Sequence, residues 1–119
     1  MSVTPSDAQA ASDTLAALER YRVHVTKLAA RWMDAELYHT VAMELDRVRH
    51  ACHALPRLSG AWVALLIAHA ELVAGLWQLS NRPAGERKAD HQRLLQRLLE
   101  SADALQDQCM KLVGPAGPA

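Results

Sequence analysis

The most apolar stretch of the chain runs from Ser59 to Ser80. It contains no proline, and its only ionisable side chains are His69 and Glu71. As a helix it would be about 30 Å long. Large apolar residues would cover a wide arc of this helix: Trp62, Leu65, Leu66, Val73, Leu76, Trp77 and Leu79. Because so wide an arc needs cover on several sides, the pattern predicts a central helix packed among other helices.

The chain before this stretch has neither glycine nor proline between Ser6 and Leu55, which permits one helix of about fifty residues. Its apolar stripe changes sides, however. One face carries Leu15, Leu18, Val25, Leu28, Ala29 and Trp32, and the stripe resumes about 200° away with Tyr38, Val41, Leu45, Val48, Cys52 and Leu55. We therefore predict a break near residues 33–36, with Asp34 capping a second helix. One long bent helix is the alternative.

Local signals place the remaining boundaries. The second helix ends at Leu55-Pro56, because the residue before a proline is pushed out of the helical region. Ser59 is the expected cap of the central helix, and Pro83 suits the first turn of a last helix. Apolar positions of that last helix repeat at spacings of four and three: His91, Leu95, Leu98, Ala102, Leu105, Cys109 and Leu112. Gly114 is the expected end.

These segments predict an all-α fold, an antiparallel up-down bundle of four helices. We expect a single domain over residues 6–113, between disordered tails at 1–5 and 114–119. A chain of 119 residues can bury a core without disulfides or metal. Alanine and leucine are good helix formers and dominate the composition, whereas phenylalanine is absent, so a sheet is disfavoured.

Charge and cysteine content indicate which partners and which cellular compartment to expect. Thirteen basic and thirteen acidic side chains cancel, so no overall field attracts nucleic acid or anionic lipid. Cys52 and Cys109 form no C-x-x-C motif and fall at core positions, which favours a reducing compartment. The first twelve residues do not resemble a signal peptide. We expect a cytoplasmic protein, and the bias towards alanine, leucine and arginine is typical of bacteria with GC-rich genomes.

The central stretch is also long enough to span a membrane. Glu71 and His69 would then lie near the bilayer centre, where a charge costs a few kcal/mol. The other amphipathic segments offer the stretch a protein environment instead. A membrane span is therefore disfavoured.

One side of the central helix carries small and polar residues at three- and four-residue spacing. These candidate interface residues are Gly60, Ala64, Ala68, Glu71 and Gly75. A glycine inside a helix costs about 1 kcal/mol relative to alanine, so two of them indicate a packing reason. We expect another helix to approach here: the last helix of the same chain, a helix of a second copy, or a helix of a different protein.

His69 lies among large apolar residues of the same helix. We predict that it is a core histidine, hydrogen-bonded across the bundle. Burial would favour its neutral form, so acidification would destabilise the fold.

A second set of polar residues forms a ridge on the second predicted helix. The histidine ridge consists of Glu36, His39, Asp46, His50 and His53. Neighbouring pairs could share a Zn²⁺ or Ni²⁺ ion, although the ridge lies opposite the apolar stripe and should face water. Binding of a metal or small ligand, through His69 or through His39, His50 and His53, is the alternative function.

Basic residues of the last helix support a second alternative, weak nucleic-acid binding. They are Arg82, Arg87, Lys88, Arg93 and Arg97. No aromatic platform or short helix-turn-helix accompanies them, so nucleic acid is a disfavoured partner.

The sequence lacks a G-x-S-x-G motif, a glycine-rich phosphate loop and a C-x-x-C-H haem motif. It therefore predicts neither catalytic residues, nor a metal ion, nor a cofactor. We expect a non-enzymatic protein–protein interaction module, a small bacterial regulator, chaperone, adaptor or inhibitor that acts through apolar helix faces. The expected partner is another protein or a second copy in a homo-oligomer.

Overall fold

The computed structural model describes residues 5–113, except for the side chains of residues 84 and 86. This range contains the helices α1 (Pro5–Ala30), α2 (Ala35–His53), α3 (Ser59–Leu79) and α4 (Ala84–Val113), with a short 3-10 helix, η1 (Pro56–Leu58), between α2 and α3. No strand occurs within it. The prediction of an all-α bundle is confirmed. The predicted tails lie outside the described residues, apart from Pro5, which begins α1.

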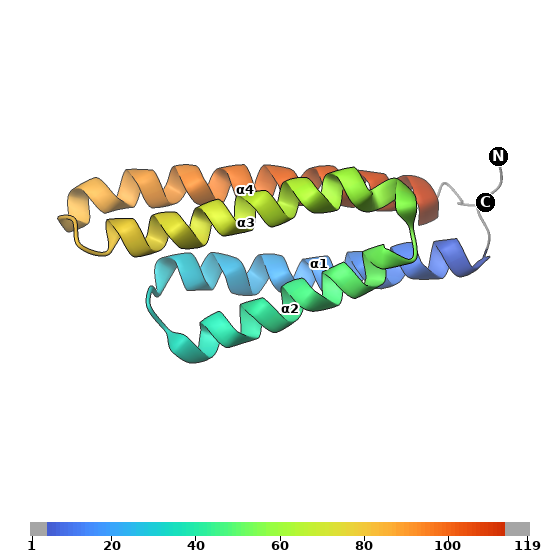
Figure 1. Cartoon of the computed structure of the whole chain (residues 1–119), viewed down its shortest axis with the longest axis horizontal. Coiled ribbons are helices and arrows are strands. Elements are labelled where there is room, and N and C mark those ends of the chain that lie inside the picture. Colours follow the sequence, from blue (N-terminus) through green and yellow to red (C-terminus); the bar gives the residue numbers. More distant parts are fainter. Residues whose placement is uncertain (1–4, 114–119) are drawn as a thin grey trace.

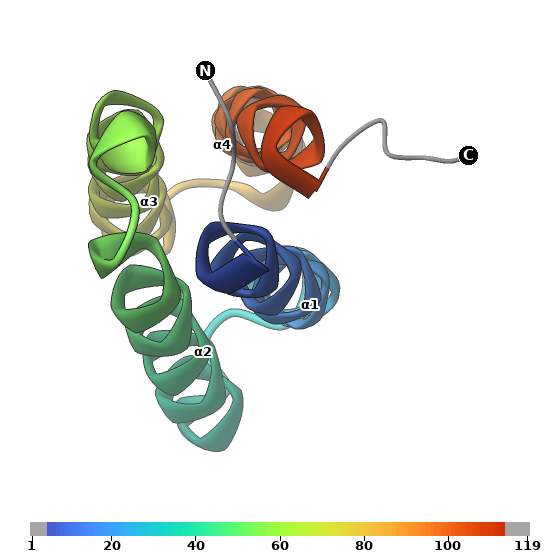
Figure 2. The same ribbon diagram turned by 90° about the vertical axis from the view of Figure 1, so that its right-hand side faces the viewer.

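The four helices form an elongated bundle of 53 × 24 × 23 Å in which consecutive helices run antiparallel (Figure 1). α1 packs against both α2 and α4, and α4 packs against α3. By contrast, α2 and α3 make few contacts. They converge near η1, and α2 leans away towards its N-terminal end (Figure 2). The expectation that every two successive helices would pack side by side therefore holds for α1–α2 and α3–α4 but not for α2–α3.

The predicted break in the first half of the chain is confirmed. α1 ends at Ala30, and α2 begins after Asp34, whose backbone is extended. The Asp34 carboxylate accepts a hydrogen bond from the Leu37 amide at 3.0 Å, which satisfies one of the unpaired donors at the start of α2. Because the chain reverses here, the displaced stripe of α2 can face α1 instead of pointing away from it. Val41 and Val48 of that stripe are buried.

The structure differs from the prediction at the starts of two helices. Ser59 does not cap α3: the helix follows η1 directly, and the residue before it, Leu58, has helical backbone angles and no capping side chain. Pro83 lies just before α4 rather than inside its first turn, and its carbonyl accepts the Arg87 amide at 3.1 Å. The 3-10 helix that begins at Pro56 thus leads directly into α3, where a serine cap was expected.

The core runs along the whole bundle and is built mainly from leucine, valine and alanine. The predicted face of α4 is confirmed from Leu98 onward, where Leu98, Ala102, Leu105, Cys109 and Leu112 are all buried, whereas its first two residues, His91 and Leu95, are half-buried. Tyr21 is the largest fully buried side chain, although the apolar stripe of α1 did not identify it.

Both cysteines are free and buried, as expected for small core residues. Burial raises the pKa of the Cys52 thiol to about 11 and that of Cys109 to about 12. The two thiols therefore stay protonated at neutral pH, and a thiol in that form is a poor nucleophile.

Removing the Asp34 cap should test the α1–α2 boundary. We expect Asp34→Ala to lower the free energy of unfolding by about 1 kcal/mol, because the Leu37 amide loses its acceptor. Asp34→Asn, which keeps a capping oxygen, should lose much less. Urea denaturation followed by circular dichroism measures both variants. Equal losses would show that the cap does not contribute to stability.

Candidate functional site

α3 presents three different sides, and they have different surroundings. The side that faces the interior is lined by Leu65, Leu72 and Leu76, each fully buried. A second side carries the small and polar residues that the sequence singled out. The third side is apolar and exposed, and it is the unusual feature of this molecule.

The structure divides the predicted small-residue strip. At Gly75 the Leu94 side chain of α4 lies so near that a Cβ atom would collide with its Cδ1 atom. Ala68 is buried in the core. Ala64 and Glu71 are exposed, and a Cβ added at Gly60 would meet nothing within 4 Å. Gly75 therefore makes room for the Leu94 side chain of α4, whereas the other end of the strip stays open, and the close approach of another helix backbone stays a prediction.

The exposed apolar side, which we call the α3 apolar face, consists of Val63, Leu66, Ile67, Ala70, Ala74 and Trp77. The larger side chains keep about half of their surface in solvent: 47% for Val63, 55% for Ile67 and 53% for Trp77. None of the six carries a charge. The expectation that Leu66 and Trp77 would be covered by neighbouring helices is wrong, because α2 leans away from α3 instead of packing along it.

The exposure of α3 is large for a helix of this composition. The segment Pro56–Leu79 has a mean hydropathy of 1.5 and is long and apolar enough to cross a membrane. Only 22% of its most apolar window is buried inside the bundle. A core helix with this sequence would be mostly buried, so the helix presents apolar surface that its own chain does not cover.

An aromatic cluster lies where α2 and α3 diverge. Trp32, in the turn between α1 and α2, packs edge-on against Trp77 of α3, with ring centroids 5.1 Å apart. The Trp32 ring also lies edge-on to the Tyr38 ring of α2, with ring centroids 6.1 Å apart. Trp32 thus links three helices at the open end of the bundle and fixes one end of the α3 apolar face.

His69 points from α3 towards α1. Its Nδ1 atom is hydrogen-bonded to the Tyr21 hydroxyl at 2.7 Å, a contact across the bundle between residues 48 apart in sequence. His69 is half-buried, and burial lowers its pKa. Burial also raises the pKa of Tyr21 far above its usual range. At neutral pH both side chains are therefore uncharged, which a partly apolar site requires.

The histidine ridge is exposed along its length. Asp46 Oδ2 lies 3.6 Å from His50 Nε2, but Arg49 also donates to the Asp46 carboxylate at 2.6 Å and lowers its pKa. Among the side chains that the structure describes, no three of histidine, cysteine or acidic residues gather closely enough to hold a metal ion. The ridge does border a surface pocket of about 420 Å³, which His39 and Asp46 line together with Ala42, Met43 and Arg47.

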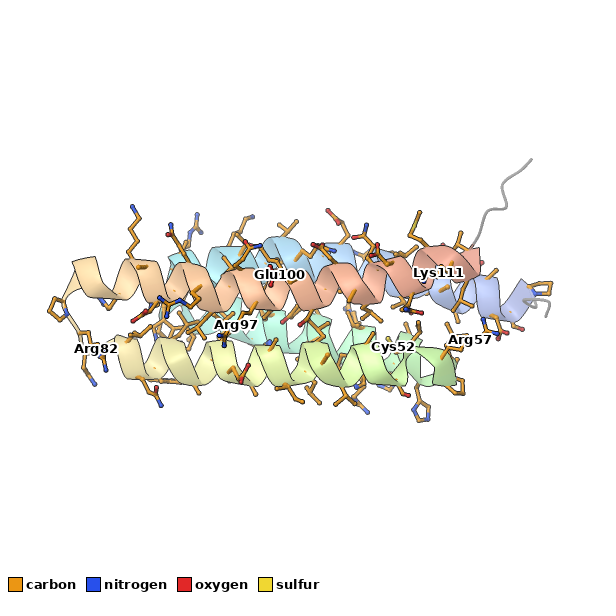
Figure 3. The ribbon with its side chains drawn as sticks, turned by 90° about the horizontal axis from the view of Figure 1, so that it is seen from above. Cys52, Arg57, Arg82, Arg97, Glu100 and Lys111 are labelled. Atoms are coloured by element: carbon orange, nitrogen blue, oxygen red, sulfur yellow. The ribbon has the colours of Figure 1, made fainter. Side chains whose placement is uncertain are left out.

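The basic residues of the last helix do not form one face. Arg82, Arg93 and Arg97 line a groove between α3 and α4, together with the acidic residues Glu71 and Asp90. Arg82 and Arg97 are labelled along that groove in Figure 3. Arg87 and Lys88 line a different cavity, between α4 and α1. A single basic surface for a nucleic-acid backbone is therefore not assembled.

Sequence reasoning missed two features. Val63 and Ile67 belong to the exposed face, yet they were not separated from the core positions, because an apolar residue gives the same signal in either place. Glu44 is buried between α2 and α1, with its Oε1 atom 2.8 Å from His24 Nδ1. Its place directly beside Leu45 in the buried stripe was the available signal.

Comparison with known proteins adds no functional assignment. No protein-family model, no curated protein and no solved structure matches the chain.

Filling the space that Gly75 leaves for Leu94 should destabilise the bundle. We expect Gly75→Leu to cost about 1–3 kcal/mol, the usual range for overpacking, because the new side chain must displace Leu94. Gly60→Leu is the matched control, since the space around Gly60 is open. Chemical denaturation of both variants tests this, and equal stability would contradict a tight α3–α4 contact at Gly75.

The lowered pKa of His69 predicts a stability that falls with acid. The unfolded chain binds the proton first, so the stabilisation is complete above about pH 6.5 and is lost as the pH falls through the lowered pKa of the folded state. We expect the urea midpoint of the wild type to decrease between pH 8 and pH 5.

His69→Gln should reduce that decrease, whereas replacement of the exposed residue His53 by glutamine should not. Burial also lowers the pKa of His91, so this residue should account for part of the decrease that remains in His69→Gln. A wild-type midpoint that is flat over this range would contradict the assignment.

Proposed function

We propose that the chain is a non-enzymatic protein–protein interaction module, of the kind used as a small regulator, chaperone, adaptor or inhibitor, and that the α3 apolar face is its contact surface. One observation carries the proposal: a continuous row of apolar side chains on α3 remains in solvent after the bundle has formed. Contiguous exposed apolar surface of this kind is typical of interaction sites.

The geometry of the face fits a helix as the binding element. From Val63 to Trp77 the face is about 20 Å long, which matches four turns of a partner helix. Its anchors recur at three- and four-residue spacing, and small residues at Ala70 and Ala74 leave room between them. Such a surface can receive the apolar stripe of an amphipathic helix.

A second copy of the chain supplies such a helix. The α3 apolar face carries no charge, and the chain has a formal net charge of zero, so two copies do not repel each other when they approach. Pairing about a two-fold axis would bring the same face of each copy together and close the assembly. A homodimer through α3 is therefore the specific form of the proposed interaction.

A charge placed in the centre of the face should separate the copies. We expect the wild-type protein to be dimeric in light scattering and Ile67→Glu to be monomeric, because a glutamate in an apolar interface would be desolvated without a partner. Met110→Glu is the matched control: Met110 lies on α4 and is 53% exposed, close to the 55% of Ile67. It should leave the dimer intact.

Two results would contradict the proposal. The first is a wild-type protein that stays monomeric at high concentration. The second is binding of the protein to phospholipid vesicles that Ile67→Glu abolishes, since the face would then contact lipid instead of protein.

A further inference from the structure

A cavity of about 520 Å³ lies between the C-terminal end of α1 and the first turns of α4. None of its lining residues belongs to α3, so it is separate from the α3 apolar face. Its volume falls within the range of about 300–1,000 Å³ that is usual for small-molecule sites.

One part of the cavity wall is apolar. It is formed by Ala29 and Ala30 at the end of α1, by Leu95 of α4 and by Trp32. The Trp32 ring is held from behind by its contacts with Trp77 and Tyr38, so it offers a fixed aromatic surface. Small alanines beside a fixed indole leave space for a flat ring.

The other part of the wall is basic. Arg87 and Lys88 line it from α4, and none of the lining residues whose side chains the structure describes is acidic. The nearby carboxylate of Asp90 is directed to Arg93, at 3.5 Å, on the side of the α3–α4 groove. The cavity therefore presents two cations to anything that enters it.

His91 also lines the cavity. Its Nε2 atom is buried and has no hydrogen-bond partner among the atoms that the structure describes. Because this atom is closed even to water, it is not a contact point for a ligand in the cavity.

We propose that this cavity binds a small aromatic carboxylate. The ring lies against Trp32 and Leu95, and the carboxylate is held by the Arg87 guanidinium. An arginine fork suits a carboxylate because both oxygens can be paired at once. Lys88 adds a second positive charge at the same end.

Calorimetric titration of the full chain with 2-naphthoate tests the proposal, with the neutral 2-naphthamide for comparison. We expect one naphthoate to bind per chain and the amide to bind at least about tenfold more weakly, because a hydrogen bond to a charged group contributes that much. Arg87→Gln should weaken naphthoate binding by about tenfold or more. Arg93→Gln, the same change on the same helix but outside the cavity, should leave it unchanged.

Two further variants locate the site. Ala30→Leu should fill the cavity and abolish binding of both compounds, which also decides the matter if Arg87→Gln fails to fold. Ile67→Glu should not affect naphthoate binding, so a failure of the proposed dimer would not be mistaken for a failure of this site. Naphthoate binding that is absent at millimolar concentration, insensitive to Ala30→Leu, matched by the amide, or lost in Ile67→Glu would overturn the proposal.

Discussion

The structure depends on how α3 is covered. This helix is apolar on nearly every side, and burial of apolar surface is the main favourable term in folding. Yet its contacts with the rest of the chain are mainly on its inner side and on the side that meets α4, with Trp32 touching one end of the exposed side, because α2 has turned its own apolar stripe towards α1. The reversal of the chain at Asp34 makes that arrangement possible. The packing of α2 against α1 therefore also leaves the α3 apolar face in solvent.

α1 holds the bundle together. It lies between α2 and α4, and its Tyr21 side chain reaches α3 through the hydrogen bond to His69. Trp32, two residues beyond the end of α1, makes a second contact with α3 through Trp77. Polar contacts also fix α1 against α4, since Arg22 pairs with Asp103 at 2.7 Å. The Arg22 side chain is mostly covered, whereas its partner Asp103 is exposed, so solvent weakens the attraction between them. The buried tyrosine and the aromatic cluster carry more of the connection.

Much of this fold follows from the order of apolar and polar residues. The displaced stripe predicted the break at Asp34, and the spacing from Leu98 to Leu112 predicted the buried face of α4. The relation between α2 and α3 could not be predicted in the same way, because both helices have apolar stripes and short connections allow them either to pack or to diverge. For the same reason Ile67 could not be recognised as exposed. The cavity beside Trp32 depends on the angle between α1 and α4, which periodicity does not determine.

The most direct test of this account is the distance between two copies of α3. A spin label attached through Ala70→Cys would report it, because Ala70 lies midway along the α3 apolar face, while the buried thiols of Cys52 and Cys109 should resist labelling. Two α3 helices packed face to face would place the labels on the order of 20 Å apart. The account predicts a pulsed dipolar measurement with such a short distance. A signal showing only isolated labels at the same protein concentration would contradict it.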